Sequence, residues 1–322
     1  MQETIKKINQ YGKQKRAFLF ILDFELKKPI VLPLDEIDSN RVLFSINESN
    51  NMICKPHYYN SKTEFKSVPV AKERYSKAFN YVQEHIKHGN SFLVNLTMPS
   101  RITTNLDLEE IFHRSNAKYK LWLKKQLVVF SPETFIKIKG RKISSFPMKG
   151  TMDASLPNAK QLLLESEKEL AEHYTIVDLI RNDLSMIAKN VTVDRFRYIE
   201  HIVTHRGGLL QMSSEISGEL PEDYNENLGE ILIKMLPAGS ISGAPKKKTL
   251  EIIKEAEQYK RGYYTGVFGV YDGENLDSGV MIRYIERNAD GLLYKSGGGI
   301  TGQSILDEEY RELIDKIYVP VT

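Results

Sequence analysis

Residues 263–296 read YYTGVFGVYDGENLDSGVMIRYIERNADGLLYKS, a stretch with three runs of mainly β-forming residues. The runs are residues 263–271, 279–286 and 291–296, and short polar segments separate them. This pattern predicts three strands connected by hairpins. The C-terminal part of the chain is therefore expected to contribute antiparallel strands to a sheet.

More strands are predicted towards the N-terminus. Polar and proline-containing turns separate short β-like runs at residues 17–22, 42–46 and 65–70. We therefore expect residues 1–70 to form a β-rich portion of the same domain as the rest of the chain. From Ala71 to Gly89, apolar residues recur every three or four positions and a glycine ends the pattern, which predicts an amphipathic helix.

The rest of the chain places strands and helices in separate groups. Helices are predicted at residues 108–115, 158–189, 228–236, 247–260 and 307–318. Further strands are predicted at residues 91–97, 126–130, 134–138 and 191–219. Grouped strands with helices between the groups favour an α+β fold over a doubly wound sheet.

The charge and hydropathy of the chain exclude some classes of protein. Its 45 Lys and Arg residues are nearly balanced by 42 Asp and Glu, for a net charge of +3. The densest basic runs, Lys124-Lys125 and Lys246-Lys247-Lys248, are short and lack interleaved aromatic residues. We therefore expect no nucleic-acid partner. Residues 17–22 form an apolar run too short for a signal sequence or a membrane span, so no membrane partner is expected.

The chain has a single cysteine, Cys54. One cysteine cannot form an intrachain disulfide or a cysteine-based metal cluster, which suits a reducing compartment and predicts a cytoplasmic location. Cys54 lies in a strand-like run rather than in a nucleophile elbow. We therefore expect no glutaminase activity from this chain.

Lys149 lies in the segment Phe146-Pro147-Met148-Lys149-Gly150-Thr151. Proline fixes one backbone angle and glycine permits unusual ones, so a tight turn here could aim the lysine from a strand end at a ligand. The lysine is then a candidate nucleophile. Taken alone, such a hexapeptide is more often a strand end with a solvated lysine, and the rest of the chain decides between the two interpretations.

Two pairs of glutamates have helical spacing. Glu169 and Glu172 lie three residues apart on one predicted helix, and Glu309 and Glu312 lie three apart on another. Four carboxylates suit Mg²⁺, which binds through a few carboxylates and keeps positions open for water or a substrate oxygen. Taken alone, either pair is more often two solvent-exposed glutamates without a specific role.

Two glycine-containing segments and one arginine are further candidates for ligand binding. Gly297-Gly298-Gly299 is predicted to be a loop before a helix capped near Ser304, where exposed N–H groups could bind an anion. Residues 239–246 superficially resemble a phosphate loop, but Pro245 removes an N–H and no Gly-Lys-Ser/Thr follows. Arg283 lies in the middle of a predicted strand, so it should face solvent or an anion.

These segments together resemble the chorismate-utilising enzymes, from about residue 70 to the end of the chain. The matching motifs are residues 131–133 (Ser-Pro-Glu), 171–183, 239–246 and 297–300, followed by Glu309, Glu312 and Lys316. The resemblance implies two large, mainly antiparallel β-sheets that face each other, with helices outside and the site at one end between them. It also implies that residues 71–322 form the chorismate-binding catalytic core.

The resemblance also implies a role for each candidate residue. Lys149 would attack the chorismate ring at C2, and Glu133 would protonate the departing C4 hydroxyl. Mg²⁺ would be bound by Glu172 and Glu312, with Glu169 and Glu309 as water-mediated or orienting partners. The remaining substrate-binding candidates are Arg283 and Tyr264 for the enolpyruvyl carboxylate, Lys316 for the other carboxylate, Gly243 and Ala244 for the ring, and Thr151, Gly298 and Gly299.

Within the family, a lysine in this turn resembles the aminodeoxychorismate synthases, which aminate chorismate with ammonia from a glutamine amidotransferase partner. Attack requires a neutral amine, so burial or a nearby cation should lower the pKa of Lys149. Leu93 stands where enzymes of the family that add water carry a lysine, which argues against that reaction. Two alternatives stay open: an anthranilate synthase, and a catalytically silent binding subunit, which Gln211 and Leu93 would support as departures from the family pattern.

Overall fold

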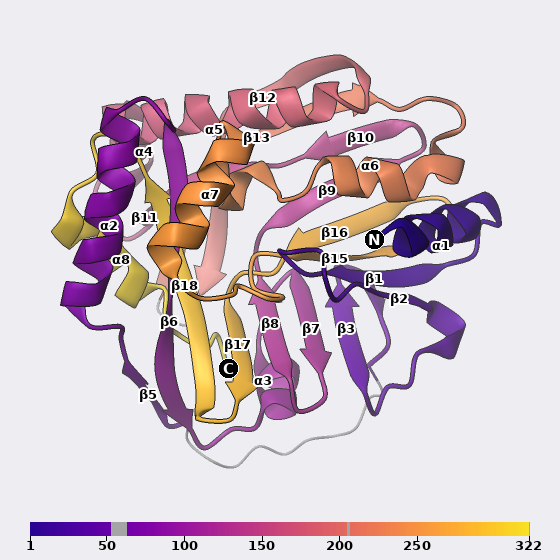
Figure 1. Ribbon diagram of the computed structural model, residues 1–322, viewed down its shortest axis with the longest axis horizontal. Helices are drawn as coiled ribbons and strands as arrows, with labels where there is room; N and C mark the ends of the chain where they lie inside the picture. Colours follow the sequence, from indigo (N-terminus) through magenta and orange to yellow (C-terminus); the bar gives the residue numbers. More distant parts are fainter. Residues whose placement is uncertain (53–62, 205–206, 322) are drawn as a thin grey trace.

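The computed structural model describes residues 1–52, 63–204 and 207–321. Its strands form two nine-stranded antiparallel sheets with helices on the outside (Figure 1), which confirms the predicted fold class. The first sheet contains β1 (Phe18–Leu22), β2 (Ile30–Pro33), β9 (Thr134–Lys139), β10 (Lys142–Ser145), β11 (Met148–Asp153), β12 (Lys189–Thr204), β13 (Gly207–Glu219), β15 (Val267–Tyr271) and β16 (Leu276–Val280).

The second sheet is built mostly from the intervening segments. It contains β3 (Val42–Ile46), β4 (Ser49–Asn50), β5 (Phe65–Val68), β6 (Leu93–Thr104), β7 (Tyr119–Leu123), β8 (Leu127–Ser131), β14 (Gly243–Ala244), β17 (Tyr284–Asn288) and β18 (Gly291–Ile300). Strands from residues 1–70 therefore join both sheets, where β1 pairs with β15 and β3 pairs with β7.

Eight α-helices in the described residues cover the sheets. They are α1 (Gln2–Lys13), α2 (Lys72–Lys87), α3 (Leu108–Arg114), α4 (Ala159–Glu165), α5 (Glu167–Ser185), α6 (Leu228–Lys234), α7 (Lys246–Glu257) and α8 (Leu306–Asp315). The apolar face of α2 is buried, as its periodicity predicted, and α3 begins with an Asp107–Glu110 capping box. No helix among the described residues is long and apolar enough to span a bilayer.

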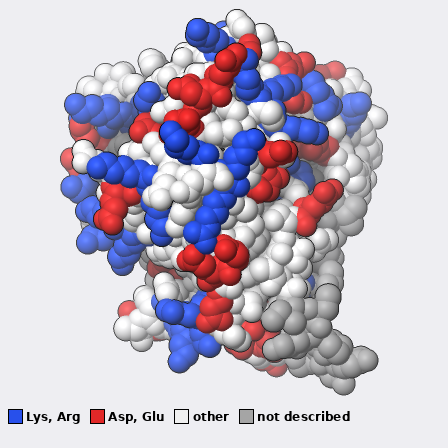
Figure 2. Space-filling view, turned by 90° about the vertical axis from the view of Figure 1, so that its right-hand side faces the viewer, with Lys and Arg blue, Asp and Glu red and all other residues white. Residues whose placement is uncertain are grey.

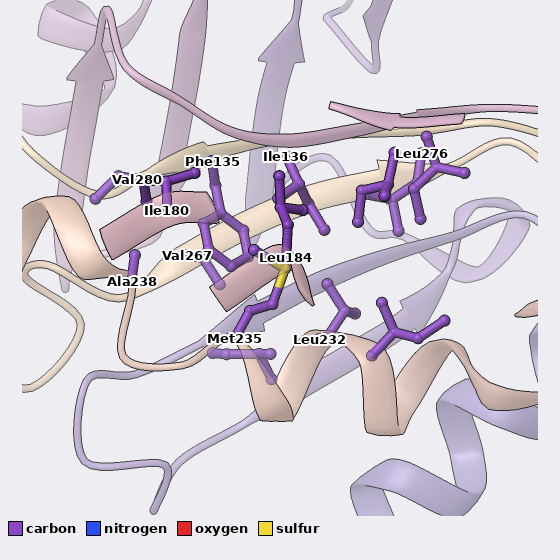
Figure 3. Packing of buried hydrophobic residues seen from close by; sticks show 14 of the residues in the cluster. Phe135, Ile136, Ile180, Leu184, Leu232, Met235, Ala238, Val267, Leu276 and Val280 are labelled. Carbon is purple, nitrogen blue, oxygen red and sulfur yellow. The ribbon is translucent and has the colours of Figure 1, made fainter. Parts of the chain in front are cut away.

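β1 explains why an unbroken apolar run forms a strand in an antiparallel sheet. Phe18, Phe20 and Leu22 belong to the core cluster shared with α5 and α6, whereas Leu19 and Ile21 pack in the cluster shared with the second sheet. Both faces of β1 are therefore covered, and all five of its residues are buried. Figure 3 shows part of the first cluster, in which side chains of β9, α5 and α6 point toward one another.

Several predicted elements differ in the structure. The single helix at residues 158–189 is two helices, because Ser166 adopts an extended conformation and its hydroxyl caps α5 by accepting from the Glu169 N–H. Residues 263–266 form turns, so β15 begins only at Val267. The N-terminal helix α1 was not predicted at all.

The prediction of a loop at residues 297–299 is also wrong. Gly297, Gly298 and Gly299 lie within β18 and pair with Thr97, Leu96 and Asn95 of β6, so this strand replaces the anion-binding loop. The next helix, α8, has Ile305 as its N-cap, without a side-chain cap. Ser304 instead receives the Thr301 N–H and donates its own hydroxyl hydrogen to Glu309.

Candidate active site

Lys149 lies in an irregular part of β11. Met148 pairs with Ser213 and Thr151 pairs with Gln211, so Lys149 and Gly150 together oppose the single residue Met212, which makes a bulge. Gly150 has a φ of +80°, a conformation that glycine adopts without strain. The predicted tight turn is therefore a bulge, and bulges commonly redirect side chains near active sites.

The Lys149 ammonium group lies at the junction of the two sheets. Its Nζ is 3.7 Å from Glu172 Oε2 on α5, and the two side chains are only 17% and 11% exposed. A Cβ atom on Gly299 would lie 2.8 Å from the same Nζ. Lys149 of the first sheet therefore packs directly on the backbone of β18 in the second.

The other three glutamates approach glycines of the same two strands. A Cβ on Gly150 would meet Glu169 Oε2 at 2.8 Å, and a Cβ on Gly298 would lie 3.2 Å from Glu312 Oε1 and 3.5 Å from Glu309 Oε2. The structure thus brings both predicted acidic pairs, one from α5 and one from α8, to the region of Lys149.

The charge of Lys149 differs from the expectation. Burial lowers the pKa of Lys149, but the neighbouring carboxylates of Glu172, Glu312, Glu169 and Glu133 outweigh it and raise the pKa above its usual value. The predicted lowering of the pKa of Lys149 is therefore wrong. The lysine is an ammonium that neutralises part of an acidic pocket.

The donor chemistry of this pocket suits Mg²⁺, because all four glutamates offer hard oxygen ligands. The side chains do not form a preassembled site: no group of three or more His, Cys, Asp or Glu residues in the described part of the chain is arranged to hold a metal ion. Glu312 accepts a hydrogen bond from Lys316 at 2.5 Å, and Glu309 is buried and bonded to Ser304.

Glu133 follows β8 and is anchored by its backbone, because its N–H bonds to the Ser131 hydroxyl and its carbonyl receives the Val280 N–H. Ser240 donates a hydrogen bond to Glu133 Oε1 at 2.5 Å. Burial raises the pKa of Glu133, and the Ser240 bond and the charge of Lys149 only partly oppose this. A carboxyl group with a raised pKa is suited to donate a proton.

Arg283 does not lie in the middle of a strand as predicted. It connects β16 to β17 with a φ of +53°. Its Nε donates a hydrogen bond to the Tyr318 hydroxyl at 3.2 Å, and its guanidinium also lies over the Tyr318 ring. Tyr264 is buried and its ring packs against Tyr284; burial raises its pKa, and the charge of Arg283 partly opposes this.

Gly243 and Ala244 form the short strand β14, which pairs with Val94 and Leu93 of β6. Gly243 has a φ of +131°, and a Cβ there would lie 1.8 Å from the Leu93 carbonyl oxygen, so only glycine fits. Leu93 in turn approaches Gly299, because its Cδ1 would lie 3.0 Å from a Cβ at that position. An apolar side chain therefore lies next to the Lys149 amine.

Three further candidates complete the comparison with the sequence. Lys316 donates to the Gly297 carbonyl at 2.9 Å as well as to Glu312. Thr151 pairs with the buried Gln211 through its backbone, while its side chain lies outside the described part of the structure. Cys54 also lies outside the described residues.

The sequence interpretation missed two residues of this region. Ser240 was noticed only as part of a segment around the ring, but it is the hydrogen-bond partner of Glu133. Tyr318 was taken as the last residue of a helix, but it holds Arg283. Neither contact has a sequence signal, because each joins residues that are far apart in the chain.

The comparisons with known proteins agree with this geometry. The sequence profile described as chorismate binding enzyme matches residues 10–322. A PabA-like protein of Haemophilus influenzae, whose function is uncharacterised, is 49% identical over 321 residues, which is 100% of this chain and 97% of the relative.

Two characterised relatives are similar over most of this chain. Aminodeoxychorismate synthase component 1 of Bacillus subtilis is 30% identical over 267 residues, which is 78% of this chain and 56% of the relative. Anthranilate synthase component 1 of Acetivibrio thermocellus is 31% identical over 283 residues, which is 80% of this chain and 54% of the relative. The chain thus spans little more than half the length of these two enzymes.

Two solved structures share the fold. The menaquinone-specific isochorismate synthase of Escherichia coli has a TM-score of 0.73 at 15% identity, covering 98% of this chain and 80% of that one. Anthranilate synthase component I of Streptococcus pneumoniae has a TM-score of 0.65 at 26% identity, covering 80% of this chain and 59% of that one.

Proposed function

Since the chain belongs to the chorismate-binding enzyme family, we propose that it aminates chorismate at C4 to give 4-amino-4-deoxychorismate. This reaction would make it an aminodeoxychorismate synthase component I in para-aminobenzoate and folate biosynthesis. The carrying observation is the buried contact of Lys149 with Glu172. A shielded amine beside carboxylates can be switched between its charged and neutral forms by a bound cation.

The reaction has two displacement steps. In the first, the neutral Lys149 amine attacks C2, the ring double bond shifts, and the C4 hydroxyl leaves as water with a proton from Glu133. In the second, ammonia attacks C4, the double bond shifts back, and the electron pair of the C2–N bond returns to Lys149. The carboxylate of Glu133 recovers its proton from the incoming nitrogen, so the enzyme is restored.

The other residues bind and orient the substrate. Arg283 and Tyr264 would hold the enolpyruvyl carboxylate, because a guanidinium binds carboxylate in a bidentate manner. Lys316 would hold the other carboxylate. The ring would approach the backbone at the small residues Gly298, Gly299, Gly243 and Ala244. Thr151, in strand β11, would also contact the substrate.

Mg²⁺ is the proposed cofactor, with Glu172 and Glu312 as its ligands and Glu169 and Glu309 as orienting partners. When bound, it would balance the negative charge of the substrate and of the four glutamates. The chain's own lysine would then lose part of the field that raises its pKa. We also propose a cytoplasmic location and a separate glutamine amidotransferase that supplies ammonia.

Anthranilate synthase component I is a second candidate, because the two characterised relatives match this chain equally well. That reaction would also require elimination of pyruvate. Incubating the purified chain with chorismate, Mg²⁺ and an ammonium salt decides between them. We expect 4-amino-4-deoxychorismate; anthranilate with pyruvate would establish the alternative, and no turnover of chorismate would favour a silent binding subunit.

Mass spectrometry tests the proposed nucleophile directly. Without ammonia, we expect a dehydrated chorismate adduct on the peptide that contains Lys149, and no adduct in Lys149→Ala. Glu133→Gln should slow adduct formation by about 10²–10⁴. In the native enzyme the rate should fall as pH rises through the raised pKa of Glu133, because the acid must be protonated. If Lys149→Ala makes product at the native rate, the lysine is not the nucleophile.

A further inference from the structure

Glu133 lines a small cavity. Its polar lining residues are Glu133, Thr134, Ser145, Asp183 and Ser240. Figure 3 labels four of its apolar lining residues, namely Phe135, Ile180, Met235 and Ala238. The volume is about 10 Å³, which is room for the centre of a single water-sized molecule.

Asp183, which lines this cavity, carries an unsatisfied acceptor. The residue is only 4% exposed, and its Oδ1 accepts a hydrogen bond from Lys246 at 2.9 Å. Its Oδ2 is buried and has no hydrogen-bond partner among the described residues. Since an unpaired buried carboxylate oxygen is costly, a donor molecule in the cavity would stabilise the arrangement.

The lining favours a small cation with several N–H donors. The Ser240 hydroxyl hydrogen is already donated to Glu133, so Ser240 offers only lone pairs to the cavity. The charges of Asp183 and Lys246 cancel, whereas an ionised Glu133 adds a negative charge to the cavity lining. Ammonium has four donors and one heavy atom, so it satisfies more of these acceptors than water does.

We propose that this cavity holds the nitrogen co-substrate as ammonium, between Asp183 and Glu133, before it attacks the ring. The inference rests on the proposed function. Once Glu133 has given its proton to the departing hydroxyl, its carboxylate takes one proton from ammonium. The resulting ammonia uses its free electron pair to bond to C4, and the C2–N electron pair returns to Lys149.

Asp183→Asn tests this assignment, because asparagine has the same shape as aspartate but no negative charge. One carboxylate oxygen becomes an NH2 group, which is a donor, and the other becomes a neutral carbonyl oxygen. Initial rates would be measured against ammonium at saturating chorismate and against chorismate at saturating ammonium. We expect the KM for ammonium to rise about tenfold or more, and the KM for chorismate to change by less than about twofold. An unchanged KM for ammonium, or an equal rise in both values, would overturn the proposal.

Asp178→Asn is the matched control. Asp178 lies on the same helix, α5, but its side chain is 67% exposed and pairs with Arg181. The same substitution there should leave both KM values unchanged. A tenfold rise in the KM for ammonium in this control would show that the effect of Asp183→Asn is not specific to the cavity.

The native protein offers a second test that does not depend on the folding of a variant. Because the cavity admits one heavy atom, methylammonium should give less than about a hundredth of the rate with ammonium at equal free-base concentration. Equal rates would overturn the proposal. If the native chain forms no aminated product with ammonium, the proposed function fails and this inference fails with it. If product forms but Asp183→Asn shows a normal ammonium KM, only this inference fails.

Discussion

Gly299 occupies a position in β18 where any side chain would meet the Lys149 amine. A Cβ there would lie 2.8 Å from Nζ and 3.0 Å from Leu93 Cδ1, both closer than ordinary van der Waals contact. The sequence interpretation valued this glycine for its N–H group in a loop. The structure gives it a different role, which is to leave space for the lysine between two sheets.

Gly299→Ala should therefore displace Lys149 and slow formation of the lysine adduct, by about tenfold or more given the sensitivity of catalysis to misplacement. Gly302→Ala is the control, because a Cβ at Gly302 meets only Ile86 at 3.7 Å, an ordinary contact. Adduct formation would be followed by mass spectrometry for both variants. Equal rates for Gly299→Ala and the native chain would contradict the packing described for Lys149.

Helix α7 is joined to the second sheet by a buried ion pair. Arg261 and Glu257 are each 1% exposed and lie 2.6 Å apart. Glu257 also accepts hydrogen bonds from the backbone and hydroxyl of Thr97, and Arg261 donates to the carbonyls of Asn95 and Ile241. Thr97 and Asn95 belong to β6, so the pair fixes the strand that carries Leu93.

Glu257→Gln should lower the free energy of unfolding by about 3–5 kcal/mol, because it leaves Arg261 charged and buried without its counter-ion. Urea denaturation would measure this loss. Glu251→Gln on the same helix is the control, since its pair with Lys248 is about half exposed and should contribute little to the free energy of unfolding. Similar losses in both variants would show that burial does not set the importance of this pair.

At the scale of the whole molecule, the fold gathers negative charge from distant segments around one lysine. Helices α5 and α8 are far apart in the chain, but the charges of Glu169 and Glu172 from α5 and of Glu312 from α8 all act on Lys149. On the face shown in Figure 2, by contrast, basic and acidic side chains are interspersed. The acidic pocket is therefore a local feature of the site in a chain with a net charge of +3.

If Mg²⁺ binds Glu172 and Glu312, it should stabilise the folded protein, because ligands that bind only the native state raise its stability by mass action. We expect Mg²⁺ to raise the Tm and a chelator to reverse the rise. Glu312→Gln should reduce it strongly, whereas Glu308→Gln, an exposed position on the same helix, should not. A full rise in both Glu172→Gln and Glu312→Gln would exclude them as ligands.

The sequence by itself determined the fold class, most of the strands and helices, and the motifs of the family. These properties follow from local periodicity and from residue types at fixed spacing, as for the apolar run of β1 and the amphipathic face of α2. It did not predict the break at Ser166, because the apolar stripe continues across it.

Only the tertiary structure decided the surroundings of the candidate residues. The raised pKa of Lys149, the space left by Gly299, and the cavity that joins Asp183 to Glu133 each depend on groups brought together from distant segments. Charge interaction, steric contact and desolvation act through space over a few ångströms. A linear pattern therefore indicates which residues can react, whereas packing of the two sheets sets the charge and position in which they do so.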